Sequence, residues 1–269
     1  MQVHRSGYYK YLKTKASGKP KNNLLMEIKN LFKESKGSYG SRRIAKGLQE
    51  KGYKIGRYRA RTMMKNEHLI CKQRRKFRLT TQSNHSRPIA ENRLNQAFKV
   101  MHPNRVWTAD ITYLCTQEGW LYLSVVLDLF SRRVVGWSIA ERMEEKLVRD
   151  ALLMALGRRN PPTGLMHHSD RGSQYASKNY QKLLKKRGIV VSMNRKGNCW
   201  DNAVMERFFG SLKSERLNNV VYKTREEARK DIVDYIEMFY NSKRLHSTLG
   251  YKTPMQYEEN YVTQVSTFT

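Results

Sequence analysis

The chain has 269 residues, of which 52 are Lys or Arg and 23 are Asp or Glu, so its formal net charge is +29. This excess indicates a polyanionic partner, above all nucleic acid, and no Lys-rich amphipathic segment with a broad apolar face supports a membrane-surface protein instead. The three cysteines are far apart and form no CxxC pair, which excludes a zinc ribbon and a disulfide framework and fits a reducing compartment.

The positive charge is concentrated in the first third of the chain. Residues 1–100 contain 26 Lys or Arg against 5 Asp or Glu, whereas residues 101–269 contain 26 against 18. The N-terminus lacks the apolar core of a signal peptide, and the longest apolar run is too short to span a bilayer, so we expect a cytoplasmic protein. The expected organisation is a basic leader (1–23), a helix-turn-helix-like DNA-binding module (24–70), a basic linker (71–98), a catalytic core (99–222) and a C-terminal helical appendage (223–269).

The N-terminal third is predicted to be helical. A short helix is expected at Tyr8–Lys13, before a break at Gly18–Pro20, and apolar spacing predicts a helix over 24–34. Ser41 is the candidate N-cap of a helix over 42–51, and a Gly-containing turn then leads to a third helix over 57–69. The candidate DNA-binding side chains of this module are Arg42, Arg43, Arg57, Arg59, Arg61 and Lys65. An ordinary basic helical hairpin is the alternative, and the charge favours DNA binding.

The residue composition changes after Phe98, where β-branched and aromatic runs predict a three-stranded antiparallel meander. Helices and two further strands follow, both parallel to the first strand, in the order β-β-β-α-β-α-β-α. Asp201 is the expected cap of the last helix, which continues to about Leu217. Gly250 and Pro254 interrupt the tail, which either packs as an appendage or lies along DNA. The predicted elements are strands over 105–115, 120–130, 133–141, 164–170 and 189–194, and helices over 143–160, 177–188, 201–217 and 226–240.

Three carboxylates on separate elements are candidates for metal-dependent phosphoryl transfer, because hard divalent cations prefer oxygen ligands. Asp110 lies within an apolar strand, Asp170 ends a later strand, and Glu206 lies on a helix, with thirty-five residues between the last two. Each has an ordinary alternative: a strand Asp on a solvated face, a turn cap, and a solvated helical Glu. Taken singly, each acid is weak evidence for a site.

Four ordered motifs connect these acids to a known family. The segments WTADITY, HSDRGSQY, NCWDNAVMERFF and YNSKRLHSTLGYKTP resemble bacterial insertion-sequence transposases, whose catalytic core is similar to that of retroviral integrases. The resemblance covers about residues 36–260. It implies a ribonuclease H-like α/β fold with a mixed five-stranded sheet flanked by helices, preceded by the small helical module. It also implies that Asp110, Asp170 and Glu206 bind two Mg²⁺ ions, for which Mn²⁺ can substitute.

The same resemblance implies the reaction and its partners. Water nicks the DNA at the element end, and the freed 3′-hydroxyl attacks another phosphodiester without a covalent protein intermediate. Lys213 matches a residue that holds the element end, and Asn202 is expected beside the metal site and the DNA. His168, Gly172, Gln174 and Tyr175 are expected to support the second acid, although packing or a backbone hydrogen bond is the simpler role for the histidine.

The expected partners are double-stranded DNA, as the terminal inverted repeats and the target, and further copies of the chain. The start of the chain lacks the leucine-zipper heptads of full-length family members, so a protein encoded by an upstream reading frame is another expected partner. A non-catalytic DNA-binding regulator of transposition and a ribonuclease H-like nuclease are the alternative functions. The retained acids weigh against the first, and the basic helical module weighs against the second.

Overall fold

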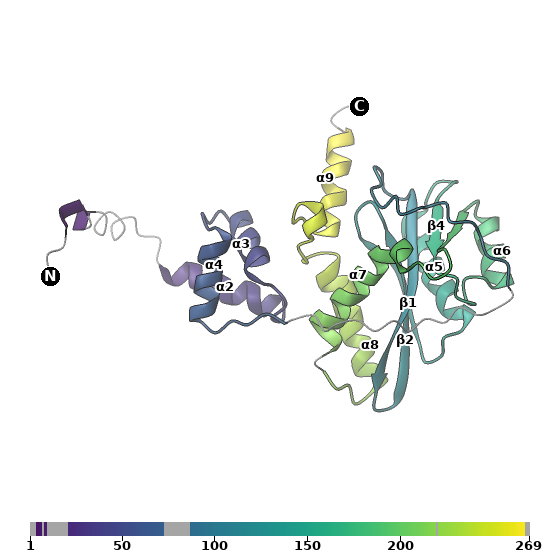
Figure 1. Ribbon diagram of the computed structural model, residues 1–269, viewed down its shortest axis with the longest axis horizontal. Coiled ribbons are helices and arrows are strands. Elements are labelled where there is room, and N and C mark those ends of the chain that lie inside the picture. Colours follow the sequence, from purple (N-terminus) through teal and green to yellow (C-terminus); the bar gives the residue numbers. More distant parts are fainter. Residues whose placement is uncertain (1–3, 7, 10–20, 73–86, 219, 267–269) are drawn as a thin grey trace. The chain divides into compact units, whose positions relative to one another are not determined.

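The computed structural model of this 269-residue chain describes residues 4–6, 8–9, 21–72, 87–218 and 220–266 (Figure 1). The chain divides into two compact units, Met1–Lys72 and Gln73–Thr269. Tyr8 and Tyr9 are helical, whereas the rest of the helix expected at Tyr8–Lys13, the break at Gly18–Pro20 and most of the basic linker lie outside the described residues.

Three helices form the first unit, as the apolar spacing predicts. They are α2 (Lys21–Glu34), α3 (Ser41–Glu50) and α4 (Arg57–Asn66). Their apolar faces meet in a small core that contains Ile28, Ile44, Leu48, Ala60 and Met64. A short turn joins α3 to α4, so the unit has the helix-turn-helix arrangement.

The predicted cap of α3 is wrong. Gly40 occupies the N-cap position with extended backbone (φ −84°, ψ 175°), and Ser41 is the first helical residue. Gly40 precedes α3 and Gly56 precedes α4. Because glycine has no side chain, neither of these two helices has a side-chain cap at its N-terminus.

The second unit is built on a mixed five-stranded sheet, which confirms the predicted strand order and directions. The strands are β1 (Val106–Thr116), β2 (Gly119–Asp128), β3 (Val134–Ala140), β4 (Met166–Ser169) and β5 (Val190–Met193). Their order in space is β3-β2-β1-β4-β5. β1, β2 and β3 form an antiparallel meander, and β4 and β5 join β1 in parallel, because helices connect them.

Helices cover both faces of this sheet (Figure 1). On one face α5 (Glu145–Arg159) and α6 (Lys178–Lys186) pack over an apolar cluster that includes Trp107, Val126, Leu152 and Leu184. Gly136 on β3 permits the close approach of α5, since a Cβ there would lie only 2.2 Å from the Ala151 carbonyl oxygen. The cluster therefore fixes β1 and β4, the two strands that lead to the candidate acids.

The other face carries the elements after β5. They are a 3₁₀ turn (Cys199–Asn202), α7 (Ala203–Leu212) with a π-helical turn (Lys213–Leu217), α8 (Arg225–Val233) with a π-helical segment (Asp234–Tyr240), a 3₁₀ turn (Ser247–Leu249) and α9 (Pro254–Ser266). Pro254 begins α9 rather than breaking the structure, because a proline at the first helical position loses no hydrogen bond. No helix among the described residues is long and apolar enough to cross a membrane.

The tail packs against the sheet unit as an appendage. Glu258 on α9 is buried against the end of the meander. Its carboxylate accepts hydrogen bonds from Ser131 (2.7 Å), Arg133 (2.7 Å) and Arg159 (3.0 Å). These contacts tie α9 to the loop after β2 and to the end of α5.

Candidate active site

The register of β1 and β4 brings the first two acids together. The parallel pairing of these strands ends at Ala109 opposite Ser169. Asp110 follows Ala109 directly, and Asp170 follows Ser169 directly. Adjacent strands lie about 5 Å apart, so the two carboxylates start from neighbouring positions. Backbone amides hold both: Ile111 N donates to Asp110 Oδ1 (2.7 Å), and Gly172 N donates to Asp170 Oδ1 (2.9 Å).

The third acid approaches from the helix that crosses β1. Glu206 lies in the first turn of α7, and its side chain is exposed. The start of this helix is fixed to β1 by Asn202, whose Oδ1 accepts a hydrogen bond from Thr108 Oγ1 (2.9 Å). Thr108 and Thr112, which share a strand face with Asp110, are buried. The face that carries Asp110 is therefore covered rather than solvated.

The negative charges of Asp170 and Glu206 both act on Asp110. Burial, and then the negative charge of Asp170, raise the pKa of Asp110 well above its ordinary value, and the charge of Glu206 adds to the rise. Although Glu206 is exposed overall, its carboxyl is partly desolvated, and this partial burial raises its pKa. Within the described part of the chain, however, no group of three or more His, Cys, Asp and Glu side chains is arranged to hold a metal ion. The described residues therefore show three acids whose charges meet at Asp110, but not three carboxylates already arranged around one metal position.

Lys213 brings positive charge to this set from the end of α7. Burial lowers its pKa, and the charge of Asp110 opposes that shift, so the ammonium and the carboxylate lie within electrostatic reach of each other. The Lys213 Nζ atom also lies 5.5 Å from the centre of the Tyr113 ring. Lys213 therefore connects Asp110 with the exposed part of β1.

The residues around Asp170 support the loop that carries it. A Cβ on Gly172 would lie 2.9 Å from Asp170 Oδ1, so a side chain there would displace the carboxylate. Gln174 Nε2 donates to the Met143 carbonyl oxygen (3.0 Å), and Tyr175 is buried. His168 is also buried, with Nδ1 2.8 Å from Ser192 Oγ and Nε2 3.0 Å from the Asp201 carbonyl oxygen. Both ring nitrogens of His168 thus make hydrogen bonds, which tie β4 to β5 and to the 3₁₀ turn before α7.

Comparison with known proteins gives this arrangement a family. An integrase core domain family matches residues 101–199, a second family of the same description matches residues 206–261, and an HTH-like domain family matches residues 19–77. The transposase of insertion sequence IS904 from Lactococcus lactis is 46% identical over 236 residues, which are 87% of this chain and 92% of that protein. The chain belongs to the insertion-sequence transposases.

Further relatives agree over almost the whole chain. An uncharacterised 31 kDa protein of insertion element IS600 from Shigella sonnei is 46% identical over 96% of both chains. Transposase InsF of IS3A from Escherichia coli is 40% identical over 96% of this chain and 91% of its own. Among solved structures, a simian T-cell lymphotropic virus intasome chain covers 81% of this chain and 70% of its own (TM-score 0.48, 20% identity). The HTLV-2 integrase catalytic core with magnesium covers 57% and 95% (TM-score 0.44, 21% identity).

In this transposase the predicted helix cap at Asp201 is wrong. The side chain of Asp201 is buried and accepts hydrogen bonds from Asn92 (2.8 Å), Gln96 (3.0 Å) and Arg195 (2.8 Å). The Arg195 hydrogen bond is the largest cause that holds the pKa of Asp201 below its ordinary value. Asn198 caps the 3₁₀ turn instead, accepting from Trp200 N (3.1 Å). Asn92 and Gln96 could not be linked to Asp201 from the sequence, because only the tertiary fold brings these segments together.

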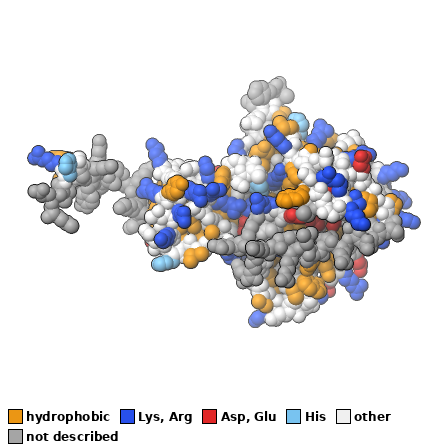
Figure 2. Space-filling model, in the orientation of Figure 1, with side chains coloured by type: hydrophobic (Ala, Val, Ile, Leu, Met, Phe, Trp, Pro, Cys, Tyr) orange, Lys and Arg blue, Asp and Glu red, His pale blue; other side chains and the backbone are white. Residues whose placement is uncertain are grey.

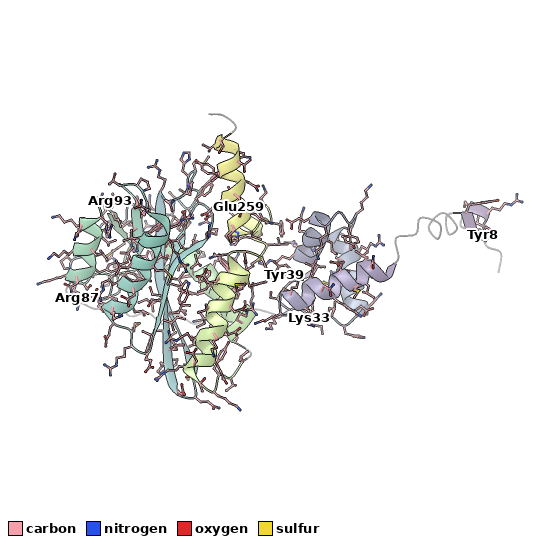
Figure 3. All side chains as sticks on the ribbon, turned by 180° about the vertical axis from the view of Figure 1, so that it is seen from behind. Tyr8, Lys33, Tyr39, Arg87, Arg93 and Glu259 are labelled. Atoms are coloured by element: carbon pink, nitrogen blue, oxygen red, sulfur yellow. The ribbon has the colours of Figure 1, made fainter. Side chains whose placement is uncertain are left out.

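The helical unit of the transposase presents its basic residues to solvent. Arg57, Arg59, Arg61 and Lys65 are exposed on α4, and Arg42 is exposed on α3, in a unit with many Lys and Arg side chains at its surface (Figure 2). Arg43 is half-buried, with its guanidinium 5.5 Å from the centre of the Tyr39 ring, which is labelled in Figure 3. Five of the six predicted DNA-binding side chains of this unit are therefore exposed to a partner.

Proposed function

We propose that this transposase nicks the DNA at the ends of an insertion element with water and joins the freed 3′-hydroxyl to target DNA, without a covalent protein intermediate. The observation that carries the proposal is the strand register, because it starts Asp110 and Asp170 from neighbouring positions at the end of the β1–β4 pairing. Family membership supports the same reading, since relatives at 40% and 46% identity are transposases by name. The alternatives of a regulator and a simple nuclease gain no support from either observation.

Asp110, Asp170 and Glu206 fit divalent cations, and we assign them as the residues that would hold Mg²⁺. Burial, and then the negative charge of Asp170, raise the pKa of Asp110, and a bound cation would stabilise the ionised carboxylate against both effects. Carboxylate oxygens are ligands that Mg²⁺ prefers. Two bound ions would stabilise the attacking and leaving oxygens of an in-line displacement, and Mn²⁺ has the same ligand preference.

The remaining residues of the site hold its parts in place and position DNA. The Asn202 side chain, buried against Thr108, fixes the start of α7 and with it the orientation of Glu206. A direct contact of Asn202 with DNA stays a prediction. The Gly172 amide orients the Asp170 carboxylate. The Lys213 ammonium, beside Asp110, neutralises a phosphate of the element end, since a lysine acts on phosphate as a point charge.

The helical unit would bind DNA through its exposed basic side chains, and its α4 helix would enter the major groove. Exposed arginines can neutralise phosphates and can also read guanine edges. Because transposition joins two element ends to one target, we also propose that further copies of the chain, together with an upstream-frame protein, assemble on the DNA. Sedimentation of the chain with and without paired-end DNA measures that assembly.

The test uses DNA joining in the presence of Mg²⁺, with the full chain and an oligonucleotide that carries the element end. Asp110→Asn, Asp170→Asn and Glu206→Gln are expected to abolish nicking and joining, because each removes one charge from the metal site, and to leave DNA binding within about twofold. Asp150→Asn, which changes a partly exposed acid on α5 that is ion-paired with Lys146, is the matched control and should retain full activity. Undiminished joining by any of the three site variants would sink the assignment.

A further inference from the structure

The hairpin of β1 and β2 exposes large aromatic rings on one face. Tyr113 is 37% exposed and Trp120 is 49% exposed, and within the described strands they are the only large hydrophobic side chains that are exposed. Tyr113 lies opposite Tyr122 in the register, and Trp120 lies opposite Cys115, so the rings share one face. The Tyr113 ring centre is 5.2 Å from that of Trp120 and 6.3 Å from that of Tyr122. We call Tyr113, Trp120 and Tyr122 the aromatic platform.

The aromatic platform lies further along β1, and strand alternation places its rings on the opposite face of the sheet from the Asp110 side chain. β1 pairs with β4 only as far as Ala109, so its edge beyond that residue is not covered by β4. Tyr113 lies three residues after Asp110, which places their Cα atoms about 10 Å apart along an extended strand. Lys213 spans this distance, because its ammonium lies over the Tyr113 ring and within electrostatic reach of Asp110.

An ordinary structural role explains only part of this arrangement. Cross-strand aromatic pairs stabilise a hairpin, and Tyr113 with Tyr122 is such a pair. That role does not require Trp120 to present half of its surface to solvent, nor a cation from another element against the Tyr113 ring. Exposed aromatic rings beside a cation are the combination with which proteins bind unpaired nucleotides, since rings stack on bases and cations neutralise the phosphates.

We propose that the aromatic platform stacks with an unpaired base of the DNA strand held at the three acids, with Lys213 at the adjoining phosphate. The proposal rests on the proposed function, because that function brings a DNA strand to Asp110. The ligand is an unpaired or frayed nucleotide of any sequence, because every base has a π face. Residues 101–269, which contain the platform, hold 26 Lys or Arg against 18 Asp or Glu, and Lys213 lies over the Tyr113 ring, so a polyanion is favoured over an apolar protein surface as the occupant.

The test measures binding of a single-stranded oligonucleotide that contains 2-aminopurine, whose fluorescence is quenched on stacking. The full chain is used without divalent ions, so that the oligonucleotide is bound but not cleaved. Trp120→Ala and Tyr113→Ala are each expected to weaken binding about tenfold and to reduce the quenching. Trp120→Phe and Tyr113→Phe keep a ring and should stay within about twofold. Leu153→Ala changes another exposed apolar side chain, on α5, and should bind normally.

The outcomes separate this proposal from the proposed function. Unchanged affinity and quenching in both alanine variants, with joining intact in the unmodified chain, would overturn the stacking proposal alone. Quenching that depends on Trp120 in a chain that fails to join DNA would support the stacking proposal and refute the proposed function. Alanine variants that change the oligomeric state but not the quenching would make the platform a protein interface, which also overturns the proposal. Thermal unfolding of every variant checks that the hairpin is folded.

Discussion

Replacing Arg244 with alanine removes the cation from a buried ion pair at the end of α7. Arg244 binds Glu215 through Nε (2.8 Å) and Nη2 (2.6 Å), and both side chains are less than 8% exposed. Tyr235 donates a hydrogen bond to the same carboxylate (2.9 Å), and Arg244 also donates to Ser211 Oγ (3.1 Å). Ser211 and Glu215 stand on either side of Lys213, so these bonds fix the segment that carries the site lysine.

The expected cost of Arg244→Ala is about 3–5 kcal/mol, because the variant leaves the Glu215 carboxylate buried without its cation. For a unit of this size each kcal/mol lowers the melting temperature by about 2–4 °C, so the midpoint should fall by roughly 6–20 °C. Urea unfolding followed by circular dichroism gives the free energy, and calorimetry gives the midpoint. Lys146→Ala, which breaks an exposed ion pair on α5, is the control and should cost under about 1 kcal/mol.

A triple variant tests the reasoning behind this magnitude. Arg244→Met, Glu215→Leu and Tyr235→Phe together replace the pair and its donor with apolar groups of similar volume. Such replacements are often neutral, so most of the lost stability should return. If Arg244→Ala alone costs less than about 1 kcal/mol, or if the triple variant is as unstable as the single one, then the buried unpaired charge is not the source of the cost.

Two further predictions concern charge. Asp110→Asn should raise the melting temperature at pH 7, because burial and Asp170 raise the pKa of Asp110, so its ionisation costs stability as the pH rises above the unfolded value of about 4. Calorimetry should show the difference closing below that pH, and added Mg²⁺ stabilising the unmodified chain only; a lower midpoint for the variant at pH 7 would contradict this. In the helical unit, Arg57→Ala or Arg59→Ala should reduce the slope of log affinity against log salt by about 0.9 per lost phosphate contact, measured by fluorescence anisotropy on duplex DNA. Unchanged slopes would show that these arginines do not touch phosphates.

Local pattern was sufficient for most of the elements. The β-branched and aromatic runs of the three meander strands, and the helical spacing in the segments that became α5 and α6, were enough to predict these elements, because such runs favour strands and a 3.6-residue period favours a helix. Helix-connected strands are parallel by chain geometry, so β4 and β5 were also predictable.

Helix ends were less predictable, because several residues near each end can serve as a cap. Asp201 is a good capping residue by type, yet Arg195, Asn92 and Gln96 bind its carboxylate from other segments. Ser41 lost the cap position to the glycine before it. For Asp201 the competing partners Asn92 and Gln96 come from tertiary structure, which a local pattern does not contain, whereas for Ser41 the competitor is its own sequence neighbour.

The sequence by itself determined which residues are candidate catalytic residues. The order of Asp110, Asp170 and Glu206, together with the sequence motifs around them, is enough to indicate the family. Only the tertiary structure decided how they meet. The β1–β4 register ends one residue before both aspartates, and the Thr108–Asn202 bond sets α7 against β1. It also revealed the aromatic platform, because cross-strand neighbours and exposure depend on pairing between strands. Motifs record residue types along the chain, whereas the distances between them are set by sheet register and packing.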